Sequence, residues 1–579
     1  MRTNILLFLF IFLPSVSISQ PYFQKITSGD IVNTQNYNHT AASADYDNDG
    51  DLDIVVTGLN DNCSGCNINI LFYRNDGDGN FTRIYDNAIA QTSVRSQGLA
   101  WADYDNDGWM DLFICCIENT RNKLFHNDGN GNFTEVTSGE IVTELNSSQF
   151  CAWADYDKDG WLDIYVTNRY GTYSNRLYKN NGDGTFTKIL SGSIANDIAE
   201  SRGCAWGDYD NDGWPDLYVT NYSGQNDFLY HNNQDGTFSR IFNVPMVNVN
   251  SWASAAQWID FDNNGVLDLY VTNNDRNNTH YYNHGNGNFT VNNSLPSNDG
   301  KGYGFTSGDY DNDGLTDLFI CNINNLNKLY KNNGASMFTK VTNEIISQEG
   351  NNSTTSSLFD YNMDGKLDLI VTNRFGYLYN YLYKNIGNTG NYITVKLNGC
   401  TSNRNAIGAK ITVHTGNMKQ YKEVSSSWDT QNYLWPHFGI GNYNMIDSLI
   451  VEWPSDQITK YYNFDGNRIV SVDECLGIIG INEEVSNVNN YELYQNYPNP
   501  FNPITNIKYE IPSSGHVTLK VYDILGNEIA SLVNEYKQTG SHQVKFDIQN
   551  SGIELSSGLY FYRLSDGINI ISKSMLLIK

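Results

Sequence analysis

An acidic nine-residue pattern recurs seven times in this chain and constrains its fold more than any other feature. The pattern is Asp-x-Asp-x-Asp-Gly-x-x-Asp, and DYDNDGWMD from Asp103 shows it complete. The copies start 49 to 58 residues apart, at Asp45, Asp103, Asp155, Asp208, Asp260, Asp309 and Asp360. Self-similarity at so steady a period indicates a repeat architecture.

Each repeat runs from the acidic loop into an apolar strand and then into a hairpin. LDIYVTN from Leu162 is such a strand, and LYKNNGDGTF from Leu177 is such a hairpin. Its Asn-Gly and Asp-Gly pairs tolerate the positive φ that tight turns require. Four short strands in about fifty residues match a propeller blade. Residues 20–390 are therefore predicted to form a seven-bladed β-propeller.

The N-terminus is predicted to close this ring. Phe23-Gln24-Lys25-Ile26 has the same form as the Phe-Thr-x-Ile strand that ends the hairpins, and it precedes the first loop. It can supply the strand that the seventh blade lacks, which leaves no open sheet edge.

The spacing of the acidic residues predicts calcium ligands. Side-chain oxygens come from positions 1, 3, 5 and 9, a backbone carbonyl comes from position 7, and the glycine permits a sharp turn. Six or more oxygens at about 2.3–2.6 Å suit Ca²⁺, whereas Mg²⁺ retains more water. No His or Cys recurs at these positions, which disfavours zinc, copper and iron. The alternative, acidic turns without metal, is disfavoured by the fixed glycine and spacing.

The predicted ligands fall into five sets, one for each position of the pattern. Position 1 is occupied by Asp45, Asp103, Asp155, Asp208, Asp260, Asp309 and Asp360. Position 3 is occupied by Asp47, Asp105, Asp157, Asp210, Asp262, Asp311 and Asn362. Position 5 is occupied by Asp49, Asp107, Asp159, Asp212, Asn264, Asp313 and Asp364. Position 7 is occupied by Asp51, Trp109, Trp161, Trp214, Val266, Leu315 and Lys366. Position 9 is occupied by Asp53, Asp111, Asp163, Asp216, Asp268, Asp317 and Asp368.

Up to seven Ca²⁺ ions are therefore expected, and they would halve the formal net charge of −28. Without them the carboxylates repel one another, so folding or rigidity should depend on calcium. Asn264 and Asn362 carry less charge than aspartate, and their two loops should bind more weakly. The acidic balance argues against nucleic acid and anionic membrane surfaces as partners.

Other repeated positions are predicted to be structural. Trp101, Trp153, Trp206 and Trp258 each precede a loop by two residues and are expected to pack between blades rather than form a ligand platform. The residues Cys115, Cys151, Cys204 and Cys321 are expected to be small buried side chains, and Cys63 and Cys66 lie in a loop that would allow a local disulfide. A basic hairpin position is interpreted as solvated; it holds Arg74, His126, Lys179, His231, Lys331 and Lys384.

Residues 20 to about 390 resemble the FG-GAP/VCBS repeat family, the integrin-α-like β-propellers. Segments such as AWADYDNDG and their hairpins carry the resemblance. It implies calcium held in hairpin loops on one rim and, commonly, adhesion or ligand display. EF-hand and RTX modules fit less well, because the flanks here are strands and no glycine-rich nonapeptide occurs.

Two further regions follow the repeats. Residues 391–475, with IGAKITV from Ile407 and VEWPSD from Val451, resemble the ASPIC/UnbV domain, although Asp456 stands where the family has glycine. A linker is predicted over 476–490. Residues 491–579, with YPNP from Tyr497 and GLY from Gly558, resemble the type A sorting domain of the type IX secretion system. The whole is predicted to be all-β: a seven-bladed propeller, a small β domain and an Ig-like C-terminal sandwich.

The termini indicate export. Residues 1–19 have a basic start, a short apolar run and a small-residue stretch, as a signal peptide does. The sorting-domain resemblance implies interaction with the type IX machinery and a secreted or outer-membrane-surface location in a Gram-negative bacterium. No other run is long enough for a transmembrane segment.

The chain is expected not to be an enzyme, because common catalytic motifs are missing. It is interpreted as a surface protein that binds an extracellular glycan or protein through loops such as Asn60–Asn69, Arg169–Asn175 and Asn221–Asp227. Two alternatives stay open: a polysaccharide-degrading enzyme on a propeller scaffold, and a structural spacer in a surface coat.

Overall fold

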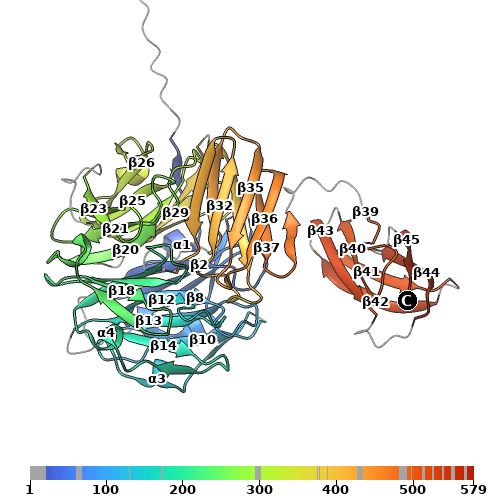
Figure 1. The fold of residues 1–579 in the computed structure, drawn as a ribbon, viewed down its shortest axis with the longest axis horizontal. Coiled ribbons are helices and arrows are strands. Elements are labelled where there is room, and N and C mark those ends of the chain that lie inside the picture. The colour runs from blue at the N-terminus through green and yellow to red at the C-terminus, as the bar shows by residue number, and fades with distance from the viewer. Residues whose placement is uncertain are drawn as a thin grey trace, which may run out of the picture. The chain divides into compact units, whose positions relative to one another are not determined.

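Seven four-stranded antiparallel groups of strands, called sheets below, follow one another in the described part of the computed structural model (Figure 1), and pairing of β25 with β28 joins the last two into one eight-stranded sheet. The structure describes residues 21–579 except 60–67, 78, 130, 171–173, 294–301, 375, 377, 388, 427–433, 482–491, 497, 512–514, 525–526, 538–539, 549–554 and 566–569. The predicted signal peptide, the Cys63–Cys66 loop and most of the predicted linker lie outside the described residues.

The first four sheets have the same strand order as the chain. The first contains β2 (Asn38–Ala44), β3 (Asp53–Gly58), β5 (Leu71–Asn75) and β6 (Phe81–Ile84). The second contains β8 (Ser96–Ala102), β9 (Asp111–Cys116), β10 (Lys123–Asn127) and β11 (Phe133–Glu135). The third contains β12 (Ser148–Ala154), β13 (Asp163–Asn168), β14 (Arg176–Asn180) and β15 (Phe186–Lys188). The fourth contains β16 (Ser201–Gly207), β17 (Asp216–Asn221), β18 (Phe228–Asn232) and β19 (Phe238–Ile241).

The last three sheets repeat this plan. The fifth contains β20 (Ala253–Ile259), β21 (Asp268–Asn273), β22 (Thr279–Asn283) and β23 (Phe289–Asn292). The sixth contains β24 (Gly302–Gly308), β25 (Asp317–Leu326), β26 (Lys328–Asn332) and β27 (Phe338–Val341). The seventh contains β28 (Gly350–Phe359), β29 (Asp368–Asn373), β30 (Tyr381–Asn385) and β1 (Phe23–Lys25).

Single turns of helix lie in the connections between sheets. They are α1 (Asp30–Asn33), α2 (Ala88–Gln91), α3 (Glu140–Thr143), α4 (Ser193–Asn196), η1 (Pro245–Val247) and η2 (Ile345–Ser347). A short pair, β4 (Ile68–Asn69) and β7 (Ser93–Val94), lies beside the first sheet.

The sheets form a closed ring. The first strands of neighbouring sheets contact one another in chain order, and β28 contacts β2. The N-terminal strand β1 pairs with β30 in antiparallel register, with Phe23 opposite Asn385 and Lys25 opposite Tyr383. The predicted closure by the Phe23 segment is thereby confirmed, and β25 also pairs with β28 across the last junction.

Tryptophans fill the junctions between sheets, as predicted. Trp101, Trp153, Trp206 and Trp258 are at most 5% exposed. The Trp206 indole Nε1 donates to the Ala152 carbonyl of the preceding sheet at 3.3 Å. The predicted buried cysteines are also confirmed, and Cys116 is buried with them.

Residues 391–481 form two further sheets that pack on the ring. One contains β34 (His437–Gly441), β31 (Asn391–Asn398), β37 (Arg468–Asp473) and β38 (Gly477–Ile481). The other contains β33 (Met418–Glu423), β32 (Lys410–Thr415), β35 (Met445–Glu452) and β36 (Ile458–Asp465). Their core is continuous with that of the second and third sheets of the ring, where Val395 and Trp153 belong to one apolar cluster. A disulfide joins Cys400 to Cys475.

The linker was predicted to begin at residue 476, but the docked sheet continues to residue 481. Residues Gly477–Ile481 form β38, which pairs with β37, and Ile478 packs against the shared apolar cluster. This apolar contact holds the segment in the sheet.

The C-terminal unit, 482–579, has a core of its own. One sheet contains β39 (Glu492–Leu493), β40 (Ile504–Ile511) and β43 (Gly540–Asp547). The other contains β42 (Glu528–Lys537), β41 (Gly515–Tyr522), β44 (Gly558–Ser565) and β45 (Ile570–Leu577). Val517, Leu519 and Val521 are fully buried, which confirms the predicted alternation. Among the described residues, no helix is long and apolar enough to cross a membrane.

Candidate metal centre

Each acidic loop connects the first strand of a sheet to the second and wraps around its own first aspartate. In every loop the glycine N–H donates to that carboxylate at 2.7–3.3 Å. Two positions allow the turn, because residue 4 has φ of 55–59° and the glycine has φ of 80–97°. Left-handed backbone explains the glycine and the frequent asparagine at position 4.

The ninth-position aspartate lies at the start of the second strand and is at most 1% exposed in every loop. Its Oδ1 accepts the backbone N–H of the asparagine that ends the third strand, at 2.7–2.8 Å in all seven sheets. The second strand thus presents this carboxylate to the loop in a fixed orientation.

The structure brings the predicted carboxylates together. In the second loop, oxygens of Asp103, Asp105 and Asp111 lie within 4.8 Å of one another, and Asp155, Asp157 and Asp163 do the same in the third. In the first loop the grouped residues are Asp45, Asp47 and Asp49. Positions 1, 3, 5 and 9 therefore converge, as a cation site requires.

Within each acidic loop, residue 7 lies beside residue 5. In each loop the residue-7 N–H donates to the side-chain oxygen of residue 5 at 2.7–3.2 Å. The indoles of Trp109 and Trp161 pack over Gly129 and Gly182 of the neighbouring hairpin, where an added Cβ would come within 2.6–2.8 Å of the ring. Close packing, in addition to positive φ, thus explains those two glycines.

Buried oxygens without partners show that the loops fit a cation. Oδ1 of Asp47, Asp157 and Asp311, all at position 3, is buried and makes no hydrogen bond. Such an atom is costly to bury unless something coordinates it. Burial, and then the charge of the neighbouring Asp159, raise the pKa of Asp155 to about 7. A divalent ion among these oxygens would offset both penalties.

The basic hairpin position is partly solvated, since its side chains are 28–44% exposed, but most of them also contact the loop carboxylates. Lys179 Nζ contacts Asp157 and lies 3.0 Å from Asp159 Oδ2, and Lys331 contacts Asp311 and Asp313 in the same way. The concentrated negative charge of the loop carboxylates attracts these cations. His126 Nδ1 lies 3.1 Å from Asp105 Oδ2, and its hydrogen bond to Asp111 raises the pKa of this histidine to about 9.

The loop of Asn264 differs from the others. Tyr282 occupies the hairpin position, its hydroxyl donates to Asp262 Oδ2 at 2.9 Å, and Asn264 Nδ2 donates to that hydroxyl at 3.2 Å. His280 Nε2 lies 3.1 Å from Asp268 Oδ2. Tyr282 and His280 thus already contact carboxylate oxygens of this loop. These contacts agree with the weaker calcium binding expected there.

Two sets of asparagines were missed by the sequence reasoning. At position 4, Asn48, Asn106, Asn211, Asn263 and Asn312 each donate to the glycine carbonyl of the next loop at 2.9–3.3 Å. The asparagine that ends each third strand donates to the second-residue carbonyl of the preceding loop at 2.7–2.8 Å, in all seven sheets. Recurrence was the available signal: the first asparagine occurs in five of the seven loops and the second in every repeat.

Residues 391–481 dock directly on the acidic loops. Lys396 Nζ lies 3.2 Å from Asp45 Oδ2, and Lys410 Nζ contacts Asp208. The Asp103 N–H donates to Asn405 Oδ1 at 2.7 Å. His437 Nε2 lies 2.8 Å from Asn312 Oδ1, so this histidine packs against the sixth acidic loop.

The turn at Asp456, where the family has glycine, also contacts the ring. Asp456 adopts φ of 64°, a conformation that glycine would take more readily. Its Oδ1 accepts from Lys158 Nζ at 2.7 Å, and Lys158 is the fourth residue of the third loop. An ion pair with the ring therefore accompanies the departure from glycine.

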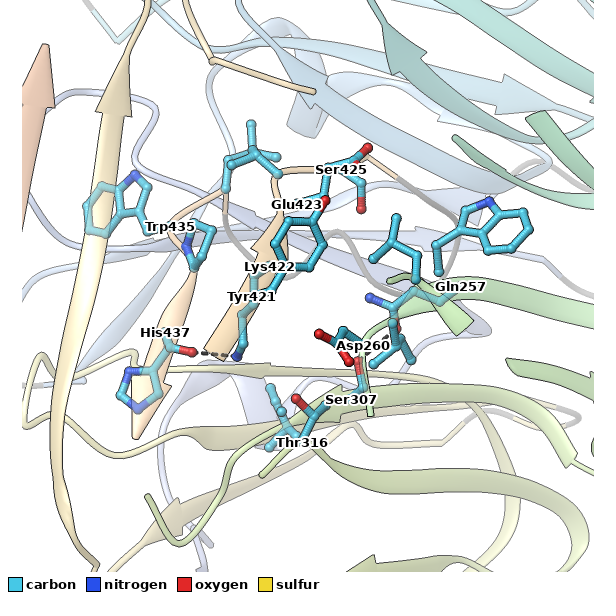
Figure 2. Close-up of a pocket in the computed structure, with 18 of the residues that line it drawn as sticks. Gln257, Asp260, Ser307, Thr316, Tyr421, Lys422, Glu423, Ser425, Trp435 and His437 are labelled. Carbon is cyan, nitrogen blue, oxygen red and sulfur yellow. Dashed lines mark hydrogen bonds between the residues drawn. The ribbon is translucent and has the colours of Figure 1, made fainter. Parts of the chain in front are cut away.

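A cavity of about 130 Å³ lies in this contact (Figure 2). Figure 2 shows Lys422 between Asp260 of the ring and His437, with Lys422 Nζ directed at the His437 carbonyl, while Glu423 lies near Ser425. Burial lowers the pKa of Lys422 and raises that of Glu423 to about 8. Part of the acidic rim, around Asp260, therefore faces a charged contact with the docked sheets.

Comparison with known families agrees with this division of the chain. The model of the FG-GAP-like repeat matches residues 45–114, 113–166, 155–219, 208–271, 260–320 and 309–371. The model of the ASPIC and UnbV family matches 399–476, and that of a secretion-system C-terminal sorting domain matches 495–579. The last match supports a secreted or surface-exposed protein.

Among curated proteins, cartilage acidic protein 1 of Xenopus tropicalis is 26% identical over 294 residues, 44% of either chain. The human protein of that name is 26% identical over 266 residues, 39% of either chain. The chain thus spans less than half the length of these relatives. Among solved structures, BBS1N in complex with ARL6DN is 10% identical, with a TM-score of 0.39 over 63% of this chain and 97% of that one.

Proposed function

We propose that this chain, a member of the FG-GAP-like repeat family, is a calcium-stabilised extracellular protein that binds a glycan or protein ligand. The observation that supports calcium most strongly is the set of buried, unpartnered oxygens of Asp47, Asp157 and Asp311 inside converging carboxylates. Oxygen ligands from one tight loop are those that Ca²⁺ prefers.

The ions would have a structural role in this proposal. The loops support the docked residues 391–481 through contacts at Asp45, Asp103 and Asp208. Calcium would neutralise the loops from within, while Lys396 and Lys410 do so from the docked sheets. A ring held rigid in this way is suited to display loops at its opposite end.

The hydrogen bonds of the loop aspartates support a non-enzymatic role. The aspartates of the loops accept backbone hydrogen bonds and are oriented as ligands, which leaves them poorly placed as an acid/base pair. Export through the type IX system of a Gram-negative bacterium would follow from the sorting domain at 495–579.

A glycan array with the full mature chain, run with calcium and with EDTA, tests this function. We expect binding that chelation abolishes, and no release of soluble sugar from polysaccharide substrates. Product release that persists in a variant unable to bind the array ligand would favour an enzyme. Binding that is indifferent to EDTA would argue against calcium-stabilised recognition.

A further inference from the structure

Histidines at the basic hairpin position set two of the seven loops apart. His126 lies on β10 beside the second loop, and His231 lies on β18 beside the fourth. Arginine, lysine or tyrosine occupies the same position beside the other five loops. An imidazole can bind a metal ion through a ring nitrogen, whereas guanidinium and ammonium groups have no acceptor to offer. The second and fourth loops thus have a nitrogen donor at this position.

In the fourth loop the imidazole lies among the carboxylates. His231 Nδ1 lies 3.1 Å from Asp216 Oδ1 and 3.4 Å from Asp210 Oδ2. Ligand atoms of His231, Asp210 and Asp212 all lie within 4.8 Å of one another. One nitrogen therefore converges with the carboxylates of positions 3, 5 and 9.

The second loop has the same arrangement. His126 Nδ1 lies 3.1 Å from Asp105 Oδ2 and 3.4 Å from Asp111 Oδ1. Ligand atoms of His126, Asp105 and Asp107 also lie within 4.8 Å of one another. The geometry is therefore a property of the hairpin histidine and not of one loop.

Tyrosine rings hold both imidazoles in place. The buried ring of Tyr104 contacts His126 edge-on, with centroids 6.4 Å apart. The buried ring of Tyr209 contacts His231 in the same way, at 6.2 Å. The two histidine side chains are 31% and 28% exposed, so an ion can reach them from solvent. A fixed ring orientation is what a ligating histidine needs.

A buried oxygen of the fourth loop also points to a cation. Asp216 is fully buried, its Oδ1 accepts the N–H of Asn232 at 2.8 Å, and its Oδ2 makes no hydrogen bond. Burying such an atom is costly unless something coordinates it. This carboxylate is the one that lies closest to His231 Nδ1, so an ion held by the imidazole would also be within its reach.

The mixed donor set and its spacing fit zinc. Ca²⁺ takes six to eight oxygen ligands, whereas Zn²⁺ binds histidine nitrogen and carboxylate oxygen together, usually with four donors in a tetrahedron. Two donors bound tetrahedrally at about 2.1 Å lie about 3.4 Å apart. The distances from each imidazole to its carboxylate oxygens, 3.1 and 3.4 Å, are close to that value.

We infer that the second and fourth loops bind Zn²⁺ in preference to Ca²⁺, with the hairpin histidine as one of four ligands. The carboxylates at positions 3, 5 and 9 would supply the oxygens, and the imidazole would release its Nδ1 proton as the metal binds. In the third and sixth loops, Lys179 and Lys331 place an ammonium group against the equivalent carboxylates. This inference rests on the proposed use of the loops as cation sites and assigns a second metal to two of them.

Zinc content in the presence of calcium tests the inference. The full mature chain is dialysed against zinc chloride with a large excess of calcium chloride, and both metals are counted by elemental analysis. We expect about two zinc ions per chain, and X-ray absorption at the zinc edge should show one imidazole nitrogen for each. A chain that retains no zinc, or zinc without a nitrogen ligand, would overturn the inference.

Substitutions that exchange residues between repeats locate the zinc. His231→Lys reproduces the hairpin residue of the third loop and should weaken zinc binding in the fourth loop by about tenfold or more. Lys179→His brings the histidine into the third loop and should add one zinc ion, a gain that a damaged fold would not produce. His284→Gln, at an exposed hairpin turn, is the matched control and should keep the wild-type count. An unchanged count in both His126→Lys and His231→Lys would reject these histidines as ligands.

Calcium counted in the same samples separates this inference from the proposed function. Bound calcium without zinc would retain the calcium-stabilised propeller and reject the zinc loops. A chain that binds neither metal would reject both. Zinc that replaces calcium in all seven loops would reject the selective role of the two histidines.

Discussion

The side-chain amide of Asn75 donates a 2.7 Å hydrogen bond to the backbone carbonyl of Tyr361, a residue 286 positions away in the chain. Asn75 ends the third strand of the first sheet, and Tyr361 lies in the acidic loop of the seventh. The same bond joins every pair of neighbouring sheets, so this one closes the cycle. Ring closure thus involves both the β1 strand and the acidic loops.

Replacing Asn75 with alanine should destabilise the fold by about 1–3 kcal/mol, because it leaves the buried Tyr361 carbonyl without this donor. Chemical denaturation measures the loss. Asn233→Ala is the matched control, since Asn233 is exposed at a hairpin and bonds only nearby side chains; it should change stability by no more than about 0.5 kcal/mol. Equal losses in the two variants would contradict the closing role of Asn75.

Replacing Asp157 with asparagine should weaken calcium binding in the third loop, on the order of tenfold, since ligand charge tunes calcium affinity over several decades. Equilibrium dialysis near the affinity of the wild-type loops should then show about one ion fewer per chain. Asp183→Asn, at an exposed hairpin turn, should retain the wild-type count. A full count in Asp157→Asn would remove Asp157 from the ligand set.

The sequence allowed the repeat, the ring closure by Phe23 and the clustering of the loop aspartates to be predicted, because each depends on local pattern. It did not show that Lys179 and Lys331 turn toward the loops, since that depends on their attraction to carboxylates that folding brings together. The docking of Lys410 on Asp208 joins residues 202 positions apart and has no local signal. The same holds for the Cys400–Cys475 disulfide, whose separation of 75 residues follows no repeat.

Replacing Lys410 with methionine should destabilise the docked sheets by about 1–3 kcal/mol, because it removes the buried ion pair that joins β32 to Asp208 of the fourth loop. Lys460→Met, at an exposed position on β36, should have little effect. Urea unfolding of the full chain measures the difference. Identical transitions for the two variants would show that the Lys410 contact does not stabilise the docking.

Acidification should weaken the docking through His437. Burial, then the charge of Lys422, lowers the pKa of His437 to about 3 from an ordinary value of 6.5, so the folded chain keeps it neutral. The unfolded chain binds a proton below pH 6.5, and the stabilisation is therefore lost as the pH falls from 6.5 toward 3. At pH 5 this loss is about 2 kcal/mol.

The comparison of wild type with His437→Gln isolates this loss, because the carboxylates titrate in both. Between pH 7 and pH 5, urea unfolding should show the wild type losing about 2 kcal/mol more than the variant. If the two proteins instead lose the same stability between pH 7 and pH 5, the folded chain binds a proton at His437 as readily as the unfolded chain does.

Calcium content, measured together with melting temperature, tests the central claim most directly. Elemental analysis of the mature chain, purified without chelators, should find several calcium ions per molecule and no more than seven, and stripping them with EGTA should lower the melting temperature until calcium is restored. A preparation that contains no calcium, and melts at the same temperature with and without EGTA, would contradict it.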